Sequence, residues 1–244
     1  MKNRENTINN YLKYCITQKR LDEKTIKAYR IDLTQFSNKT NNIALEQINV
    51  DILEDYISFL NNCYKPKTVK RKLASIKAFF HYLEYKDIII FNPFNKMVTQ
   101  FREPVILPKV IPLHTVEHFL STIYKQLNEA DTSYKRKNAL RDVAAAEILF
   151  STGIRISELC SLKPQDINLS TGTILIYGKG DKERRITIGN NQVLQILNQY
   201  KKTYHSEINM CHHFFANQSG KPLNDQAVRR MINKYCSLAS IDLQ

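Results

Sequence analysis

The first hundred residues place apolar side chains with the period of α-helices. In three successive segments apolar residues recur at intervals of three or four positions, and in the second of them at i, i+3, i+4 and i+7, which gives each segment one apolar stripe. Asp22 and Asn49 stand where N-caps belong, and Pro66 suits the first turn of the third segment. Together with an earlier helix around residues 6–18, the pattern predicts a small bundle of four helices.

A stretch rich in proline interrupts this pattern. Residues 101–112 contain three prolines and show little periodicity, which is typical of a linker. The chain therefore divides into a helical domain over residues 1–100 and a second domain over residues 113–244.

The second block mixes helical and strand periods. Thr115 is a possible N-cap, and residues 140–150 are apolar almost all round, as in a buried central helix that Gly153 could close. Residues 173–177 and 185–188 are β-like and are joined by a glycine-rich turn, after which helical patterns return. The predicted fold is mainly α, with a four-helix domain followed by a mixed α/β, mostly helical domain that carries a small antiparallel β-hairpin sheet.

The charge indicates the class of partner. The net charge is +13 and the isoelectric point is about 9.5, with the excess spread over both halves of the chain. Neutralising phosphates releases condensed counterions, so a nucleic acid is the leading partner. A merely basic protein without such a partner is the alternative.

Location and metal binding are constrained by what the sequence lacks. No apolar run reaches the roughly 18 residues of a membrane helix, and the first residues do not resemble a secretory signal, so we expect a soluble cytoplasmic protein with no membrane partner. Five scattered cysteines without a CxxC pair indicate reduced thiols. Cys211, His212 and His213 precede an apolar run, and in a strand adjacent side chains point to opposite faces, so we expect no metal site there.

Arg155 is the first candidate for chemistry. It follows the turn at Gly153, and a guanidinium offers a planar fork of donors that matches phosphate oxygens. Glu158 follows about one helical turn later and could orient that fork. The alternative is an ordinary surface pair worth a few tenths of a kcal/mol.

Lys179 is the second candidate. It lies between two glycines of the predicted hairpin turn, from which a lysine can swing into a groove and donate a proton to a leaving oxygen. The alternative is a solvated polar turn. Three further cations close by are expected to contact the phosphate backbone rather than to perform chemistry: Lys182, Arg184 and Arg185.

These segments resemble a known family. TGIRISEL at 152–159 and GKGDKER at 178–184 are similar, in order and spacing, to the tyrosine recombinase (phage-type integrase) family of site-specific recombinases. The helical segment TVKRKLASIKAFFHYL at 68–83 and the exit Asn92-Pro93-Phe94 resemble its N-terminal core-binding (SAM-like) domain. The resemblance covers nearly the whole chain.

The resemblance implies a two-domain clamp around double-stranded DNA, in which a tyrosine attacks a phosphodiester to form a 3′-phosphotyrosyl link. Arg155 would neutralise a non-bridging oxygen, Lys179 would be a general acid and Glu158 would support the arginine. No metal or nucleotide cofactor is implied. Self-association on DNA, as a dimer or tetramer, is implied for a complete protein.

The sequence departs from the family pattern toward its end. The family continues with a His-x-x-Arg box and a nucleophilic tyrosine, but no His-x-x-Arg follows Lys179, and Tyr200, Tyr204 and Tyr235 lie upstream of where that box belongs. We therefore expect a C-terminally incomplete catalytic domain that is inactive alone. The alternative function is a DNA-binding protein that occupies recombination sites without cleavage, and a weaker third is a general basic binder of nucleic acid.

A second set of cations lies on the predicted helix at residues 67–84. Opposite its apolar stripe stand four cations, with Ala74 and Ala78 on the same side. Small residues let a helix approach a groove while cations reach phosphates, although a solvated charged face is the alternative. The residues expected to contact DNA are Lys67, Lys70, Arg71 and Lys77.

Overall fold

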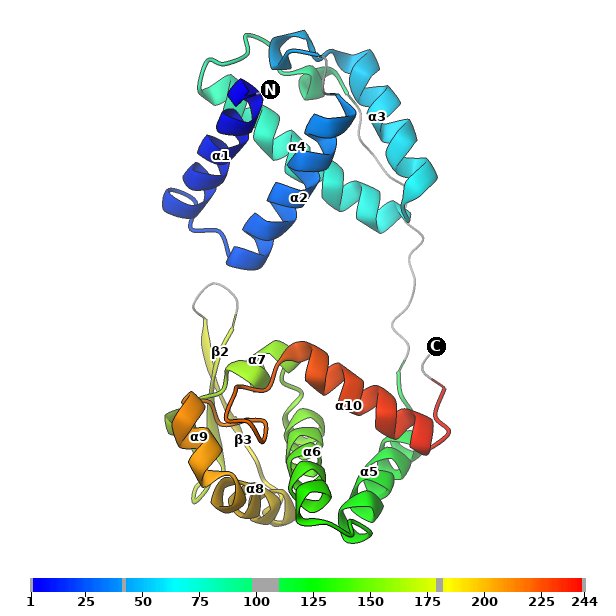
Figure 1. Cartoon of the computed structure of the whole chain (residues 1–244), viewed down its shortest axis with the longest axis vertical. Helices are drawn as coiled ribbons and strands as arrows, with labels where there is room; N and C mark the ends of the chain where they lie inside the picture. The colour runs from blue at the N-terminus through cyan, green and yellow to red at the C-terminus, as the bar shows by residue number, and fades with distance from the viewer. Residues whose placement is uncertain (1, 41–42, 98–109, 179–181, 243–244) are drawn as a thin grey trace. The chain divides into compact units, whose positions relative to one another are not determined.

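The computed structural model describes residues 2–40, 43–97, 110–178 and 182–242 (Figure 1). The chain divides into two compact units, Met1–Leu107 and Pro108–Gln244. Each unit has its own hydrophobic core, so each is described by itself.

The described part of the first unit is helical, as the sequence pattern predicts. Asp22 and Asn49 are N-caps whose side chains accept backbone N–H bonds, and Pro66 is the first residue of its helix. The elements are α1 (Lys2–Thr17), α2 (Glu23–Lys39), η1 (Leu45–Gln47), α3 (Val50–Cys63), α4 (Pro66–Tyr85) and η2 (Pro93–Lys96).

Aromatic rings from distant segments meet in the core of this unit. Phe36 of α2 makes edge-to-face contacts with Tyr56 of α3, at 5.0 Å between ring centroids, and with Phe80 of α4, at 5.9 Å. Phe80 also contacts Phe94, at 5.5 Å, and the side chain of Asn92 caps the short η2 turn that carries Phe94. The segment Asn92-Pro93-Phe94, which follows the four helices, is therefore part of the core of this unit.

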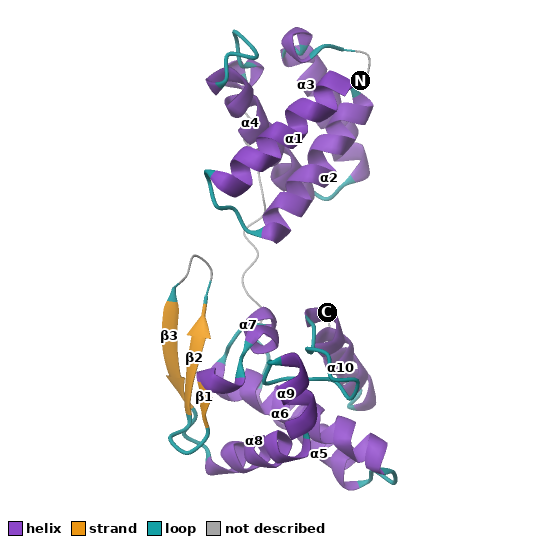
Figure 2. Ribbon diagram, turned by 60° about the vertical axis from the view of Figure 1, so that its left-hand side comes forward, coloured by secondary structure: helices purple, strands orange, loops and turns teal. Residues whose placement is uncertain are grey.

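The second unit is built around a buried helix, α6, which contacts α5, α7 and α8 (Figure 2). Burial on nearly all sides of residues 139–148 confirms the central helix expected from the sequence. Gly153 ends it with φ +64°, a left-handed conformation that glycine adopts readily. The helices are α5 (Leu113–Asn128), α6 (Ser133–Thr152), α7 (Ile156–Ser161), η3 (Pro164–Asp166), α8 (Asn191–Thr203), α9 (His205–Cys211) and α10 (Asp225–Leu238).

A small antiparallel sheet completes this unit, in the order β1-β2-β3 among the described residues. Its strands are β1 (Ile167–Asn168), β2 (Thr173–Tyr177) and β3 (Glu183–Thr187). The hairpin of β2 and β3 confirms the predicted β-signals. The two-residue β1 is too short to produce a period in the sequence, and it was not predicted.

Two local predictions were wrong. α5 begins at Leu113 directly after Pro112, whose fixed φ starts the helix, so Thr115 lies in the first turn and is not the cap. Cys211 ends the helix α9, which was not predicted, and His212 has φ +55°, so this segment is not a strand. Within the described residues, no group of three His, Cys, Asp or Glu side chains is arranged to hold a metal.

The described part of the chain contains no helix that is both long and apolar enough to span a membrane.

The core of the first unit can be tested at two neighbouring positions of α2. Leu33 is fully buried whereas Ile31 is 56% exposed. We expect Leu33→Ala to lower the free energy of unfolding of this unit by about 2 to 5 kcal/mol, because it leaves a cavity. Ile31→Ala, the matched control, should change it by less than about 0.5 kcal/mol. Urea-dependent hydrogen exchange of amides in α1–α4 reports this unit separately, and equal effects of the two changes would contradict the described packing.

Candidate active site

Arg155 stands at the junction between the central helix and α7. The left-handed turn at Gly153 reverses the chain, and Arg155 is the extended N-cap residue of α7. Its backbone N–H donates to Oε2 of Glu158 at 2.8 Å, and its Nη1 donates to Oε1 at 3.0 Å. The side chain of Arg155 nevertheless remains 73% exposed, so most of its guanidinium faces solvent.

Glu158 is the centre of this site. Its side chain is only 6% exposed, and its two oxygens accept bonds from both Arg155 and Arg184. Arg184 donates from Nη1 to Oε1 at 2.9 Å and from Nη2 to Oε2 at 2.7 Å, a bidentate pairing. The pair Arg155–Glu158 is therefore not the ordinary surface pair that the sequence left open, because the carboxylate is buried and shared.

The electrostatics keep this carboxylate charged. The bonds from Arg184, followed by those from the backbone and side chain of Arg155, outweigh burial and lower the pKa of Glu158 to about 2. At neutral pH one buried negative charge thus faces two guanidinium groups, and the site keeps a net positive charge that an incoming phosphate can meet.

Arg184 reaches Glu158 because of the alternation of β3. It pairs across the hairpin with the buried Ile176 and lies on the same face as Ile186, whereas Arg185 points to the solvent side. The sequence reasoning treated Arg184 and Arg185 alike, as contacts to phosphates. The alternation of half-buried and exposed positions along this strand is the sequence signal that could have distinguished the inward Arg184 from the outward Arg185.

The neck of the hairpin passes next to the same carboxylate. The N–H of Gly178 donates to the carbonyl of Lys182 at 2.7 Å, and a Cβ on Gly178 would lie 3.9 Å from Oε1 of Glu158. Lys182 is exposed. Lys179, the predicted general acid, lies outside the described residues, but the residue that precedes it in the chain is thereby located beside Glu158.

The predicted DNA-contacting residues of α4 lie in the first unit. Lys67 and Lys70 are exposed, and Lys77 is half-buried, in agreement with a polar face opposite the apolar stripe. Arg71 is also on this face, but its guanidinium is paired with Asp32 of α2, a contact that the sequence did not reveal.

The tyrosines near the end of the chain are structural. Tyr200, Tyr204 and Tyr235 are fully buried, and each hydroxyl has a partner. Tyr235 donates to Oδ2 of Asp142 at 3.1 Å, and burial is the largest cause that raises the pKa of all three phenols, to about 12 for Tyr204. These phenols are neutral at physiological pH and out of reach of a DNA phosphate.

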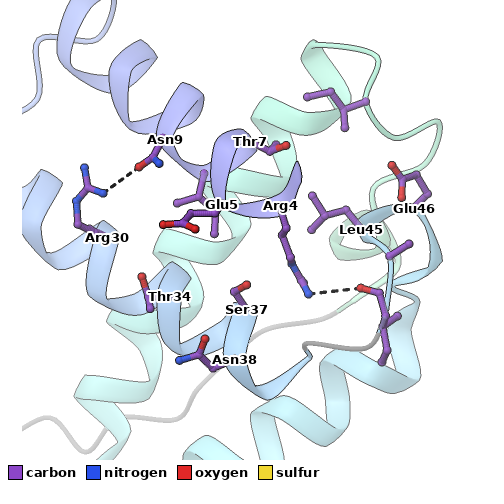
Figure 3. Close-up of a pocket in the computed structure, with 14 residues that line it drawn as sticks. Arg4, Glu5, Thr7, Asn9, Arg30, Thr34, Ser37, Asn38, Leu45 and Glu46 are labelled. Carbon is purple, nitrogen blue, oxygen red and sulfur yellow. Dashed lines mark hydrogen bonds between the residues drawn. The ribbon is translucent and has the colours of Figure 1, made fainter. Parts of the chain in front are cut away.

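A pocket of about 920 Å³ lies in the first unit, beside α1, α2 and the segment at 43–46 (Figure 3). None of the predicted site residues lines it. Its two arginines are used internally: Arg30 donates to Asn9 at 3.0 Å, and Arg4 donates to the backbone carbonyl of Thr40 at 2.7 Å.

Comparison with protein families identifies both units. The profile of the Phage integrase family matches residues 118–244, and the profile of the Phage integrase N-terminal SAM-like domain matches residues 8–86. A tyrosine recombinase of Agathobacter rectalis is 63% identical over 243 residues, which cover 100% of this chain and 79% of that protein. The tyrosine recombinase XerC of Staphylococcus saprophyticus is 32% identical over 235 residues, covering 91% of this chain and 73% of XerC.

Solved structures share the fold. The XerH recombinase, in a post-cleavage complex with its palindromic difH substrate, aligns with a TM-score of 0.75 at 22% identity. The alignment covers 90% of this chain and 64% of that chain. A lambda integrase dimer bound to a COC′ core site aligns with a TM-score of 0.71 at 14% identity, covering 98% and 64%. The chain thus spans a little under two thirds of these solved proteins.

The role of Arg184 can be tested through the acidity of its partner. We expect Arg184→Met to raise the pKa of Glu158 from about 2 toward its ordinary value, because the largest stabilising bonds to the carboxylate are lost. Carbon-13 NMR titration of the labelled carboxyl group measures this directly. Arg185→Met, one residue away on the solvent side, is the matched control and should leave the pKa at about 2; an unchanged pKa in both variants would contradict the pairing.

The lowered pKa of Glu158 also makes the stability of the fold depend on pH. Because the pKa of Glu158 is lowered in the folded chain, its ionised form stabilises the fold above the ordinary value near 4.5, and this contribution is lost as the pH falls through about 2. Arg184→Met should therefore show a shallower loss of unfolding free energy between these pH values than the parent chain does.

Proposed function

The chain belongs to the phage integrase family, the tyrosine recombinases, and on that premise we propose that it binds duplex DNA at a recombination site. In a complete protein it would cleave and rejoin strands through a 3′-phosphotyrosyl intermediate. The main observation behind this proposal is the arrangement at Glu158. Its buried carboxylate accepts one bond from the backbone N–H of Arg155 and one from the guanidinium, while most of the Arg155 side chain stays exposed.

Arg155 is suited to bind a scissile phosphate. It gives one guanidinium N–H to Glu158 and directs the rest of a 73% exposed side chain outward, so its position is fixed before substrate arrives. Donors arranged in advance stabilise charge that develops on a non-bridging oxygen without reorganisation at the moment of reaction. Glu158 orients Arg155 and does not itself contact the phosphate in this proposal.

Lys179 is proposed as the general acid toward the leaving oxygen. Support comes from its neighbour Gly178, which lies beside Glu158 and so links the hairpin turn to the site of Arg155. A lysine ammonium is a mobile proton donor, which suits this role. Chemistry that relies on these groups needs no metal or nucleotide cofactor.

The cations of α4 and of the hairpin are proposed to contact the phosphate backbone. Each charge that neutralises a phosphate releases counterions and contributes to affinity without regard to sequence. This group comprises Lys67, Lys70, Lys77, Lys182 and Arg185, and Arg184 is assigned to Glu158 instead.

A second candidate function is a DNA-binding protein that occupies recombination sites without cleaving them. One observation favours it for these 244 residues: the three tyrosines after the hairpin are buried and hydrogen-bonded, so none can act as the nucleophile. Self-association on DNA as a dimer or tetramer is proposed for the complete protein, and we propose a cytoplasmic location for it.

The phosphate contacts can be measured through salt dependence. We expect Lys67→Ala with Lys77→Ala to weaken duplex binding and to lower the slope of log K against log salt by about 2, close to 0.9 for each lost contact. Fluorescence anisotropy of a labelled duplex between low and moderate salt provides the slope. Lys201→Ala with Lys202→Ala, two exposed lysines in the last turn of α8, is the matched control of equal charge change. Equal slopes in both double variants would contradict a specific role for α4.

Covalent chemistry can be tested with a nicked suicide substrate that traps a protein–DNA adduct. We expect no adduct from the 244-residue chain, because its late tyrosines are buried. The adduct should appear for the same sequence extended through a His-x-x-Arg box and a terminal tyrosine. An adduct formed by the 244 residues alone would refute the incomplete site, and none from the extended protein would refute the recombinase function.

A further inference from the structure

Asp32 is a fully buried carboxylate in the first unit, on the face of α2 that packs against α4. Three side chains of α4 bind it. Lys72 donates to Oδ1 at 3.0 Å and Ser75 donates to Oδ2 at 2.9 Å. Arg71 pairs with both oxygens through its two Nη atoms, with Nη2 at 3.0 Å from Oδ1.

The two cations that bind Asp32, Lys72 and Arg71, differ in how far they are exposed to solvent. Lys72 is buried, donates also to Oε1 of Gln35 at 2.6 Å, and lies 4.8 Å from the ring centre of Tyr64. The ammonium group of Lys72 therefore interacts with groups inside the unit and not with a ligand. The side chain of Arg71 is 49% exposed, so the guanidinium that Asp32 holds on one side faces solvent on the other.

Arg71 is not required to satisfy the buried carboxylate. Lys72 already supplies the opposite charge and Ser75 a second donor, so a helix-to-helix ion pair would exist without Arg71. What Arg71 gains from Asp32 is a fixed orientation. A bidentate carboxylate uses two of the five N–H donors of a guanidinium and leaves the others in a defined plane.

A fixed plane of donors can bind the edge of a base as well as a phosphate. Flexible lysines satisfy phosphates as point charges, whereas guanine offers O6 and N7 side by side to a planar fork. The surface around Arg71 also permits close approach, because Ala74 is exposed and Ala78 is half-buried on the same helix. A helix with small side chains next to its arginine can enter the major groove.

We propose that Arg71 reads a guanine in the major groove and that Asp32 is the positioning residue that fixes its guanidinium for this contact. The proposal rests on the proposed duplex binding of this chain. It assigns sequence specificity to the first unit and separates Arg71 from the lysines of α4, whose contacts carry no sequence information.

The test is selection of bound duplexes from a randomised DNA library, followed by anisotropy titrations of the selected duplex and of versions with single base changes. The parent chain should select guanine at one position of each recognition element. Arg71→Lys keeps the charge and removes the fork, so it should lose this preference by roughly 5- to 150-fold at that position. Its salt slope should stay unchanged, since one cation is still present.

Two further variants distinguish the alternatives. Lys67→Ala should weaken binding to all sequences alike and lower the salt slope by about 1 while the guanine preference persists. Asp32→Asn should lose the guanine preference as Arg71→Lys does, with thermal unfolding used to verify that it is folded. If Asp32→Asn does not fold, Arg71→Lys decides the matter alone, because Lys72 and Ser75 still bind Asp32 in that variant.

The outcomes are separable. Unchanged guanine preference in Arg71→Lys, or a uniform loss across all sequences, would overturn the assignment of Arg71 while leaving duplex binding intact. Failure of the parent chain to bind any duplex in the library would overturn the proposed function and this inference together.

Discussion

The site depends on one interaction, the sharing of the buried Glu158 carboxylate between Arg155 and Arg184. A carboxylate removed from water is costly unless it is fully bonded, and here four N–H groups satisfy it. Because Arg155 is the N-cap residue of α7 and Arg184 lies in β3, this single charge joins a helix start to a hairpin. The geometry of the candidate active site follows from that connection.

The first unit uses the same arrangement for a different purpose. Asp32 is buried and is bound by several donors, and one of them, Arg71, remains half exposed. In both units a hidden acid thus holds an arginine toward solvent. The arginines keep their charge for a ligand, while the entropy of ordering their long side chains is lost during folding instead of on binding.

Much of the fold was accessible from the sequence because local signals agreed with one another. Periods of 3.6 marked the helices, Asp22 and Asn49 marked two of their starts, and Gly153 marked the end of α6. The missed elements, β1 and α9, are short, so that neither repeats a period often enough to be recognised.

Only part of the site could be predicted from the sequence. Arg155 and Glu158 are three residues apart, so their pairing is a local event that spacing can predict. Arg184 lies 26 residues from Glu158, and Arg71 lies 39 residues from Asp32. Such contacts are decided by which face a strand or helix buries against its neighbour, and only tertiary packing determines that.

The shared carboxylate also makes three positions interdependent. A replacement at residue 155 alters the bonds that Glu158 can make with Arg184, and a replacement at residue 184 alters those left for Arg155. The effects of changes at these positions are therefore non-additive, as for any residues in one hydrogen-bonded network. In evolutionary terms we expect the three side chains to form an epistatic unit, in which a substitution at one position requires changes at its partners.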